Sequence, residues 1–283
     1  MPELRSSPPG DAGRSAEASI TPPAQFSRRR FVAGGVALAA TRFPAGAQVC
    51  ALIPEQEQGP FYLADELVRS NIVEGKPGLP LSLHIVVMDV RSCTPLANAA
   101  VDIWHCDALG LYSGFTKQNL MGPGGPPPGG QRGMGPPPEN HPSDALTFLR
   151  GIQLTDSNGA VTFQTIFPGY YMGRTNHIHF KVRLGGGESQ RTYQAGHTSH
   201  TGQIFFPEEL AVELMAQEPY RNHKIHRTTQ EEDQVYGDQH GKLSVARVDP
   251  LSSGLRAELI AAVDPSATPG PAGRMGGPRG PRN

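Results

Sequence analysis

The sequence carries almost no net charge and has no long apolar run. Its 25 lysine and arginine residues are balanced by 26 aspartate and glutamate residues, which gives a formal charge of −1. This balance provides no basic surface for a nucleic acid, and no apolar run approaches the ~20 residues of a transmembrane helix. We therefore expect no nucleic-acid partner and no membrane span. The 283 residues allow one or two domains, and all-β folds commonly use about 200–250 residues in a single domain.

Cysteine is also scarce. The chain has three, Cys50, Cys93 and Cys106, and their spacings match no zinc-binding pattern. Two of them could pair in an oxidising compartment, which would leave one thiol over. The sequence does not decide which two would pair.

The amino-terminal stretch is typical of an export signal. In SRRRFVAGGVALAA (Ser27–Ala40), paired arginines precede a short run of small and apolar residues, and Ala45 and Ala47 follow at the spacing of a signal-peptidase site. The stretch resembles a twin-arginine signal; the alternative is a chance basic patch before a core helix. We expect residues 1–47 to be a signal peptide and disordered leader. The twin-arginine translocase would then be a transient partner, and the mature protein would be periplasmic or extracellular.

Composition divides the rest of the chain. We expect one domain over residues 48–263. Inside it, residues 121–142 are rich in Gly and Pro, which predicts a long surface insertion without strand or helix. Residues 264–283 are rich in Pro, Gly and Arg, which predicts a disordered tail.

Most of the predicted domain consists of short strands. The stretches that alternate or are β-branched are residues 81–90, 99–106, 148–156, 160–167, 177–184 and 202–206. The DSNGA turn (Asp156–Ala160) is a strong hairpin signal, so we expect the third and fourth strands to pair directly. Residues 207–217 have helical spacing, with Pro and acidic residues at the start. The sequence therefore predicts an all-β fold, an antiparallel β-sandwich with long loops and one short helix.

One predicted strand carries two histidines two residues apart. His177 and His179 share a strand face, because side chains i and i+2 point the same way. Two tyrosines accompany them: Tyr171 lies six residues before His177, and Tyr112 follows the strand over 99–106. Imidazole suits several transition metals, but phenolate is a hard anionic donor that favours a trivalent ion. The set therefore indicates Fe(III) rather than zinc; the alternative for each tyrosine is an aromatic that packs on the core.

These motifs resemble those of a known family. The pattern Tyr-x-x-Arg-x-x-His-x-His over 171–179, together with VDIWHCDALGLYS (Val101–Ser113) and PEQEQGPFYL (Pro54–Leu63), is similar to the intradiol ring-cleavage dioxygenases. This family includes catechol 1,2-dioxygenase and protocatechuate 3,4-dioxygenase. The likeness covers most of the ordered chain but not the long helical amino-terminal region of catechol 1,2-dioxygenases. Their mode of dimerisation is therefore not expected to transfer, and a homo-oligomer stays possible.

The resemblance implies a reaction and a set of site residues. The substrates would be an aromatic 1,2-diol and O2, and ring cleavage between the hydroxylated carbons would give a muconate-type dicarboxylate. Tyr171 would take a proton from the diol, while Arg174 would stabilise negative charge on the ring and Gln203 would line the site. Non-haem Fe(III) would be held by Tyr112, Tyr171, His177 and His179.

Two other functions stay open from the sequence. One is a non-catalytic β-sandwich module that binds a metal or an aromatic compound. The other is a zinc or copper enzyme in which His105 joins the two strand histidines. Tyr170 also competes with Tyr171 as a ligand, although the family pattern favours Tyr171. We interpret Trp104 as a core residue. The remaining histidine pairs are interpreted as surface residues: His197 with His200, and His223 with His226.

Overall fold

The computed structural model describes residues 50–64, 67–117 and 141–270. The predicted leader (1–47), nearly all of the predicted insertion (121–142) and most of the tail (264–283) lie outside the described residues. Their boundaries stay predictions.

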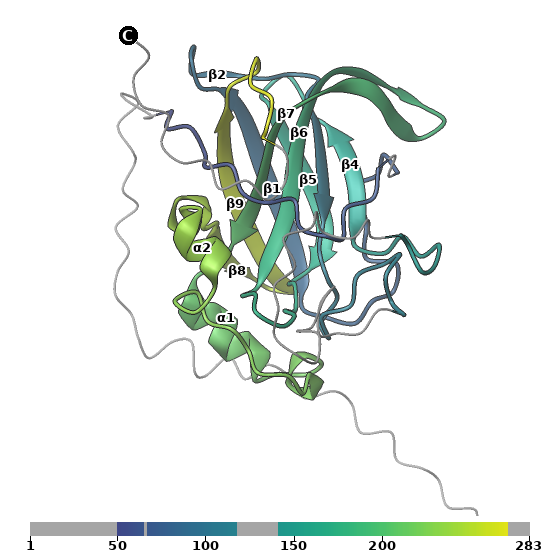
Figure 1. Cartoon of the computed structure of the whole chain (residues 1–283), viewed down its shortest axis with the longest axis vertical. Coiled ribbons are helices and arrows are strands. Elements are labelled where there is room, and N and C mark those ends of the chain that lie inside the picture. The colour runs from purple at the N-terminus through teal and green to yellow at the C-terminus, as the bar shows by residue number, and fades with distance from the viewer. Residues whose placement is uncertain (1–49, 65–66, 118–140, 271–283) are drawn as a thin grey trace, which may run out of the picture. The chain divides into compact units, whose positions relative to one another are not determined.

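The described residues form two β-sheets (Figure 1). The first sheet has the order β2-β1-β9-β8, and β5 also pairs with β1; the second has the order β4-β3-β6-β7. The strands of the first sheet are β1 (Pro80–Asp89), β2 (Thr94–Pro95), β5 (Ala160–Ile166), β8 (Arg247–Leu251) and β9 (Gly254–Val263). The strands of the second sheet are β3 (Ala100–Trp104), β4 (Arg150–Leu154), β6 (His177–Ser189) and β7 (Thr192–Phe205).

The main core lies between the two sheets. Strand β1 buries every second side chain, with Leu81, Leu83 and Ile85 fully covered. Residues of β3, β6, β7 and β9 join the same apolar cluster. Each aliphatic side chain covered in this way contributes about 1.5–3 kcal/mol relative to an exposed one. The predicted all-β sandwich is confirmed.

Two details of the topology differ from the prediction. Strands β1 and β9 pair in parallel, with Leu81 opposite Leu255, so the sandwich is not purely antiparallel. The DSNGA turn does not close a hairpin, because β4 pairs with β3 while β5 pairs with β1. Asp156 Oδ1 accepts the backbone N–H groups of Asn158 (2.8 Å) and Ala160 (2.9 Å). This side-chain capping makes a compact turn that carries the chain from one sheet to the other.

Short helical segments follow the second sheet. Helix α1 (Glu208–Met215) buries Ala211 and Leu214 in the main core. A five-residue helix α2 (Gln234–Asp238) comes later, and 3-10 turns occupy Tyr220–Asn222 and Gly241–Ser244. Figure 1 shows α1 and α2 on the same side of the strands. Within the described residues, no helix is long and apolar enough to cross a membrane.

The structure shows which two cysteines pair. Cys50 and Cys93 form a disulfide with a Cα–Cα distance of 5.7 Å. Cys106 is free and buried, and burial raises the pKa of its thiol well above the usual value. The disulfide ties the start of the described chain to the turn that follows β1.

Candidate metal centre

The candidate site lies on the face of the second sheet that points away from the main core. On β6, Ile178 and Phe180 face the core, so His177 and His179 face the other way. A segment that we call the strap, residues 56–63, crosses this outer face. Gln56 donates its backbone N–H to Thr201 O (3.0 Å) on β7. The site is therefore built against the sandwich and covered by the strap.

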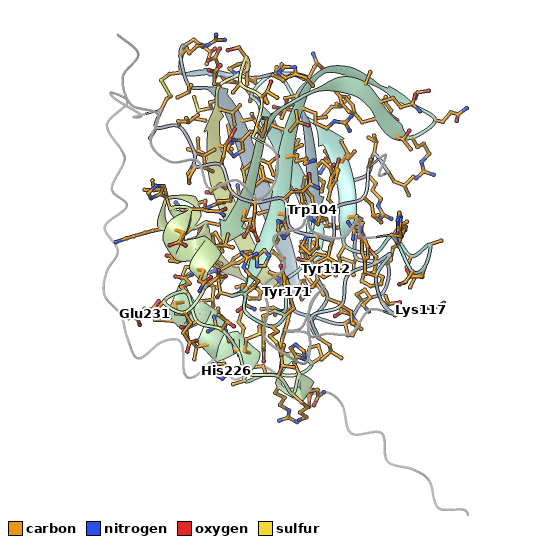
Figure 2. The ribbon with its side chains drawn as sticks, viewed as in Figure 1. Trp104, Tyr112, Lys117, Tyr171, His226 and Glu231 are labelled. Atoms are coloured by element: carbon orange, nitrogen blue, oxygen red, sulfur yellow. A yellow bond between two sulfur atoms is a disulfide. The ribbon has the colours of Figure 1, made fainter. Side chains whose placement is uncertain are left out.

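Four rings meet under the strap. The ring centroids of His177 and His179 lie 4.6 Å apart, those of Tyr171 and His177 lie 5.6 Å apart, and those of Tyr112 and Tyr171 lie 5.7 Å apart. Figure 2 shows Tyr112 and Tyr171 near the middle of the molecule, beneath Trp104. The four predicted metal ligands are thus brought together, although they come from two loops and one strand.

The two histidines are held as neutral donors. Burial, followed by the charge of Arg174, keeps the pKa of each well below the usual value. His177 donates from Nδ1 to the carbonyl oxygen of Thr175 (2.7 Å), which leaves a lone pair on its Nε2. That Nε2 lies 3.0 Å from Nε2 of His179. Two imidazoles that bind one metal at about 2.1 Å, at a right angle, have their nitrogens about 3.0 Å apart.

The two tyrosines need a cation to ionise. Burial raises the pKa of Tyr171 to about 12 and raises that of Tyr112 well above its ordinary value. The Tyr112 hydroxyl is buried and makes no hydrogen bond with any described residue. A buried polar group without a partner is costly, and a metal ion would satisfy it as phenolate. The donor set therefore fits a trivalent metal ion such as Fe(III).

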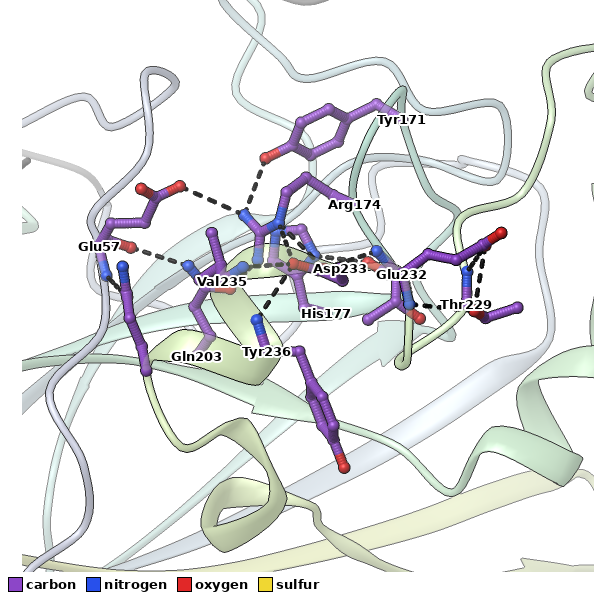
Figure 3. A network of polar contacts seen from close by, with 12 residues as sticks. Glu57, Tyr171, Arg174, His177, Gln203, Thr229, Glu232, Asp233, Val235 and Tyr236 are labelled. Atoms are coloured by element: carbon purple, nitrogen blue, oxygen red, sulfur yellow. Dashed lines mark hydrogen bonds and ion pairs between the residues drawn. The ribbon is translucent and has the colours of Figure 1, made fainter.

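A polar network holds Arg174 next to this cluster (Figure 3). Its Nε donates to both carboxylate oxygens of Asp233 (3.0 and 3.1 Å). Its Nη2 donates to Gln203 Oε1, and its Nη1 donates to Tyr171 Oη (3.4 Å). Glu57 Oε1 lies 3.6 Å from the same Nη1. The guanidinium is therefore fixed with one edge toward the hydroxyl of Tyr171.

The structure separates Tyr170 from Tyr171. Tyr170 donates its hydroxyl to the carbonyl oxygen of Ile225 (3.2 Å) and packs against His223 with centroids 4.7 Å apart. Tyr171 instead points to His177 and Arg174. Tyr170 thus contacts the loop that contains His223 and Ile225, while Tyr171 belongs to the ring cluster.

His105 and Trp104 are neighbours on the chain but make different contacts. Both ring nitrogens of His105 make hydrogen bonds, to the carbonyl oxygen of Cys106 (2.8 Å) and to Thr165 Oγ1 (2.7 Å). The zinc or copper alternative used this histidine, and in the structure neither nitrogen faces the cluster. Trp104 is buried and stacks on His179 with centroids 4.9 Å apart and planes 4° apart. It fixes the orientation of that imidazole.

One prediction about the other histidines is wrong. His200 is not a surface residue: it is buried, and burial lowers its pKa to about 4. The His200 side chain lies on the same sheet face as Phe180 of the neighbouring strand β6, and the centroids of the two rings are 5.3 Å apart. His197, which forms a pair with His200 only in the sequence, is exposed. His226 is also exposed, and His223 is half-buried.

Sequence reasoning missed two charged residues of the network, Glu57 and Asp233. Asp233 has one available signal, since it precedes the short run that forms α2, and it caps this helix by accepting the N–H groups of Val235 (2.9 Å) and Tyr236 (3.1 Å). Glu57 lies in the quoted motif PEQEQGPFYL. Nothing local indicates that either residue contacts Arg174.

Comparison with known proteins identifies the family. No family model matches the chain. An intradiol ring-cleavage dioxygenase from Tetranychus urticae is similar in structure, with a TM-score of 0.65 and 35% sequence identity, over 78% of this chain and 98% of that one. A chlorocatechol 1,2-dioxygenase from Pseudomonas putida is 26% identical over 155 residues, which is 48% of this chain and 50% of the relative. A catechol 1,2-dioxygenase from Acinetobacter baylyi is 30% identical over 123 residues, which is 42% of this chain and 32% of the relative.

The alignments define a class. The chain spans half or less of the length of the two curated relatives, but nearly all of the structural relative from Tetranychus urticae. It therefore belongs to the intradiol ring-cleavage dioxygenase family, as the sequence motifs predicted.

Proposed function

We propose that the protein is a non-haem Fe(III) dioxygenase that cleaves a catechol-type 1,2-diol between its hydroxylated carbons. The observation that carries this proposal is the buried set of two tyrosines and two neutral histidines beside Arg174. The names of the relatives support the substrate class. The reaction adds both atoms of O2 to the diol, so the electrons come from the substrate and no external reductant is needed.

Four residues would hold the iron: Tyr112, Tyr171, His177 and His179. When bound, Fe(III) supplies Lewis-acid chemistry that lowers the pKa of the diol hydroxyls. The two histidines contribute neutral lone pairs, and the two tyrosines contribute negative charge that burial otherwise disfavours. The protein would thus match a high metal charge with two anionic donors.

Tyr171 is placed to move a proton. The high pKa that burial gives it makes its phenolate a strong base, and Arg174 Nη1 donates to the same Oη and stabilises the anion. Tyr171 Oη would accept a proton from a diol hydroxyl, and Tyr112 would stay in place. Arg174 is then beside the ring and can stabilise negative charge that develops there.

Gln203 would act by positioning. It accepts from Arg174 Nη2, and its own Nε2 donates to the carbonyl oxygen of Glu57 (2.9 Å). It therefore links β7, Arg174 and the strap. Its contribution is to hold the guanidinium at a fixed angle to Tyr171.

The test uses the purified chain loaded with iron. Tyrosinate bound to Fe(III) absorbs visible light, so we expect a reddish protein that consumes one O2 for each catechol without added reductant. A colourless iron-loaded protein, or no oxygen uptake with any 1,2-diol, would reject the proposal. A colourless protein that binds an aromatic diol without turnover would favour the non-catalytic module instead.

We also propose that the protein is exported by the twin-arginine route. The Cys50–Cys93 disulfide supports an oxidising destination. Replacing Arg28 and Arg29 by lysine should retain the protein in the cytoplasm, as cell fractionation would measure. Unchanged export would reject this route.

A further inference from the structure

Glu57 differs from Asp233, the other charged partner of Arg174, because its side chain is partly exposed. The Asp233 side chain has no exposed surface and that of Arg174 is 8% exposed, whereas that of Glu57 is 34% exposed. Glu57 Oε1 and Tyr171 Oη both contact Arg174 Nη1, at 3.6 and 3.4 Å. Figure 3 shows the carboxylate and the hydroxyl on the same edge of the guanidinium. A fixed negative charge thus lies beside the hydroxyl proposed to receive the substrate proton.

The backbone holds this charge in place. The N–H of Glu57 donates to Gln239 Oε1 (2.7 Å), and its carbonyl oxygen accepts from Gln203 Nε2 (2.9 Å). Next to it, Gln56 Oε1 accepts the N–H of Gln203 (2.6 Å). The strap is therefore bonded to β7 and to the loop after α2 at this point, and the backbone of Glu57 is fixed within reach of Arg174.

The charge of Arg174 is already compensated by its neighbours in the network. Its Nε is bonded to Asp233, its Nη2 to Gln203, and its Nη1 faces Tyr171 and Glu57. The two carboxylates outweigh the single guanidinium charge. A carboxylate on the substrate ring would meet repulsion from Glu57, and the guanidinium charge that could offset it is already matched by Asp233.

We infer that Glu57 is a specificity-determining residue that selects uncharged catechols and rejects catechols that carry a ring carboxylate. This inference rests on the proposed function. It goes further, because it assigns the selection to one residue of the strap and to its charge.

The experiment compares two ligands of similar size, 4-methylcatechol and 3,4-dihydroxybenzoate. Their affinities for the iron-loaded full chain are measured without oxygen by equilibrium dialysis. We expect the wild type to prefer 4-methylcatechol, and Glu57→Gln to reduce this preference on the order of tenfold, the effect of one like charge near a protein surface. Oxygen-uptake values of kcat/KM should shift in the same direction. The matched control is Glu74→Gln, since the Glu74 side chain is 35% exposed and is paired with Arg69 (2.5 Å).

The outcomes separate the two proposals. If Glu57 only holds Arg174 in place, Glu57→Gln weakens the binding of both ligands equally. The ratio of the two affinities then stays the same, which overturns the inference. If 4-methylcatechol is cleaved but the ratio does not respond, the inference fails and the proposed function stands. If the wild type binds neither diol and consumes no oxygen, both fail.

Discussion

Replacing Asp233 by asparagine should destabilise the protein strongly although the side chains have nearly the same size. Asp233 is fully buried and accepts from Arg174 Nε, from the N–H of Thr175 (2.8 Å), and from the N–H groups of Val235 and Tyr236. Asparagine keeps one oxygen, so some of these donors would face an NH2 group instead. The charge of Arg174 would also lose the buried partner that compensates it.

The magnitude follows from the burial of the pair. Removing one partner of a buried ion pair costs about 3–5 kcal/mol. In a domain of about 150–250 residues, each kcal/mol lowers Tm by roughly 2–4 °C. We therefore expect Asp233→Asn to lower Tm by about 6–20 °C.

The assay is thermal unfolding followed by circular dichroism or calorimetry, with Asp238→Asn as the control. Asp238 lies on the same short helix and is exposed, so the control should stay within about 0.5 kcal/mol of the wild type. A drop in Tm of less than about 3 °C for Asp233→Asn would refute the reasoning, because it corresponds to roughly 1 kcal/mol. In that case Arg174 would be held by its other contacts.

Three further predictions concern Arg174, Tyr112 and His200. Arg174→Lys should keep iron and colour but slow oxygen uptake at least ~100-fold, because an ammonium cannot make the contacts of the planar guanidinium; near-wild-type rates at full iron content would leave Arg174 a structural role only. Tyr112→Phe should weaken the visible band of the iron-loaded protein and leave the Tm of the iron-free protein unchanged or higher, because a buried hydroxyl without a partner is removed; an unaltered spectrum would exclude Tyr112 as a ligand. In the folded protein burial lowers the pKa of His200 to about 4, whereas in the unfolded chain its pKa is near 6.5. Stability should therefore fall by about 3 kcal/mol as pH drops from 6.5 to 4, at 1.36 kcal/mol for each pKa unit. Denaturant melts of His200→Leu should fall less over this range, and equal losses would contradict the assignment.

The sequence predicted those parts of the structure that depend on local patterns. Alternation and β-branched residues located six of the strands, and the period of two on β6 placed His177 and His179 on one face. Strands β2, β8 and β9 were not predicted. Strand β2 has only two residues, and the polar residues of β8 and the alternation of β9 follow loops without clear signals. The hairpin expected at Asp156–Ala160 failed for a related reason: turn chemistry fixes the local bend but not which strands pair across it.

The site shows the same division. Tyr112, Tyr171 and the two histidines were predicted from their residue types and spacing together with the family resemblance, and the structure brings their rings together. Asp233 and Glu57 were missed because their contacts with Arg174 depend on how distant segments fold back. Fifty-nine residues separate Arg174 from Asp233, and no sequence period spans that distance. His200 was misinterpreted because its stretch is polar, whereas the fold buries it beside Phe180.

The stacking of Trp104 on His179 has a kinetic consequence. One face of the imidazole lies against the indole, and on the strap a Cβ at Gly59 would come within 3.0 Å of Cε1 of the same ring. Gly59 has φ +67°, a conformation that suits glycine and lets the backbone approach this closely. The imidazole is therefore clamped, and a half-turn about its Cβ–Cγ bond, which would put Cε1 where Nε2 lies, has to wait until the strap lifts. The orientation that presents Nε2 to the centre is therefore held for as long as the strap stays in place.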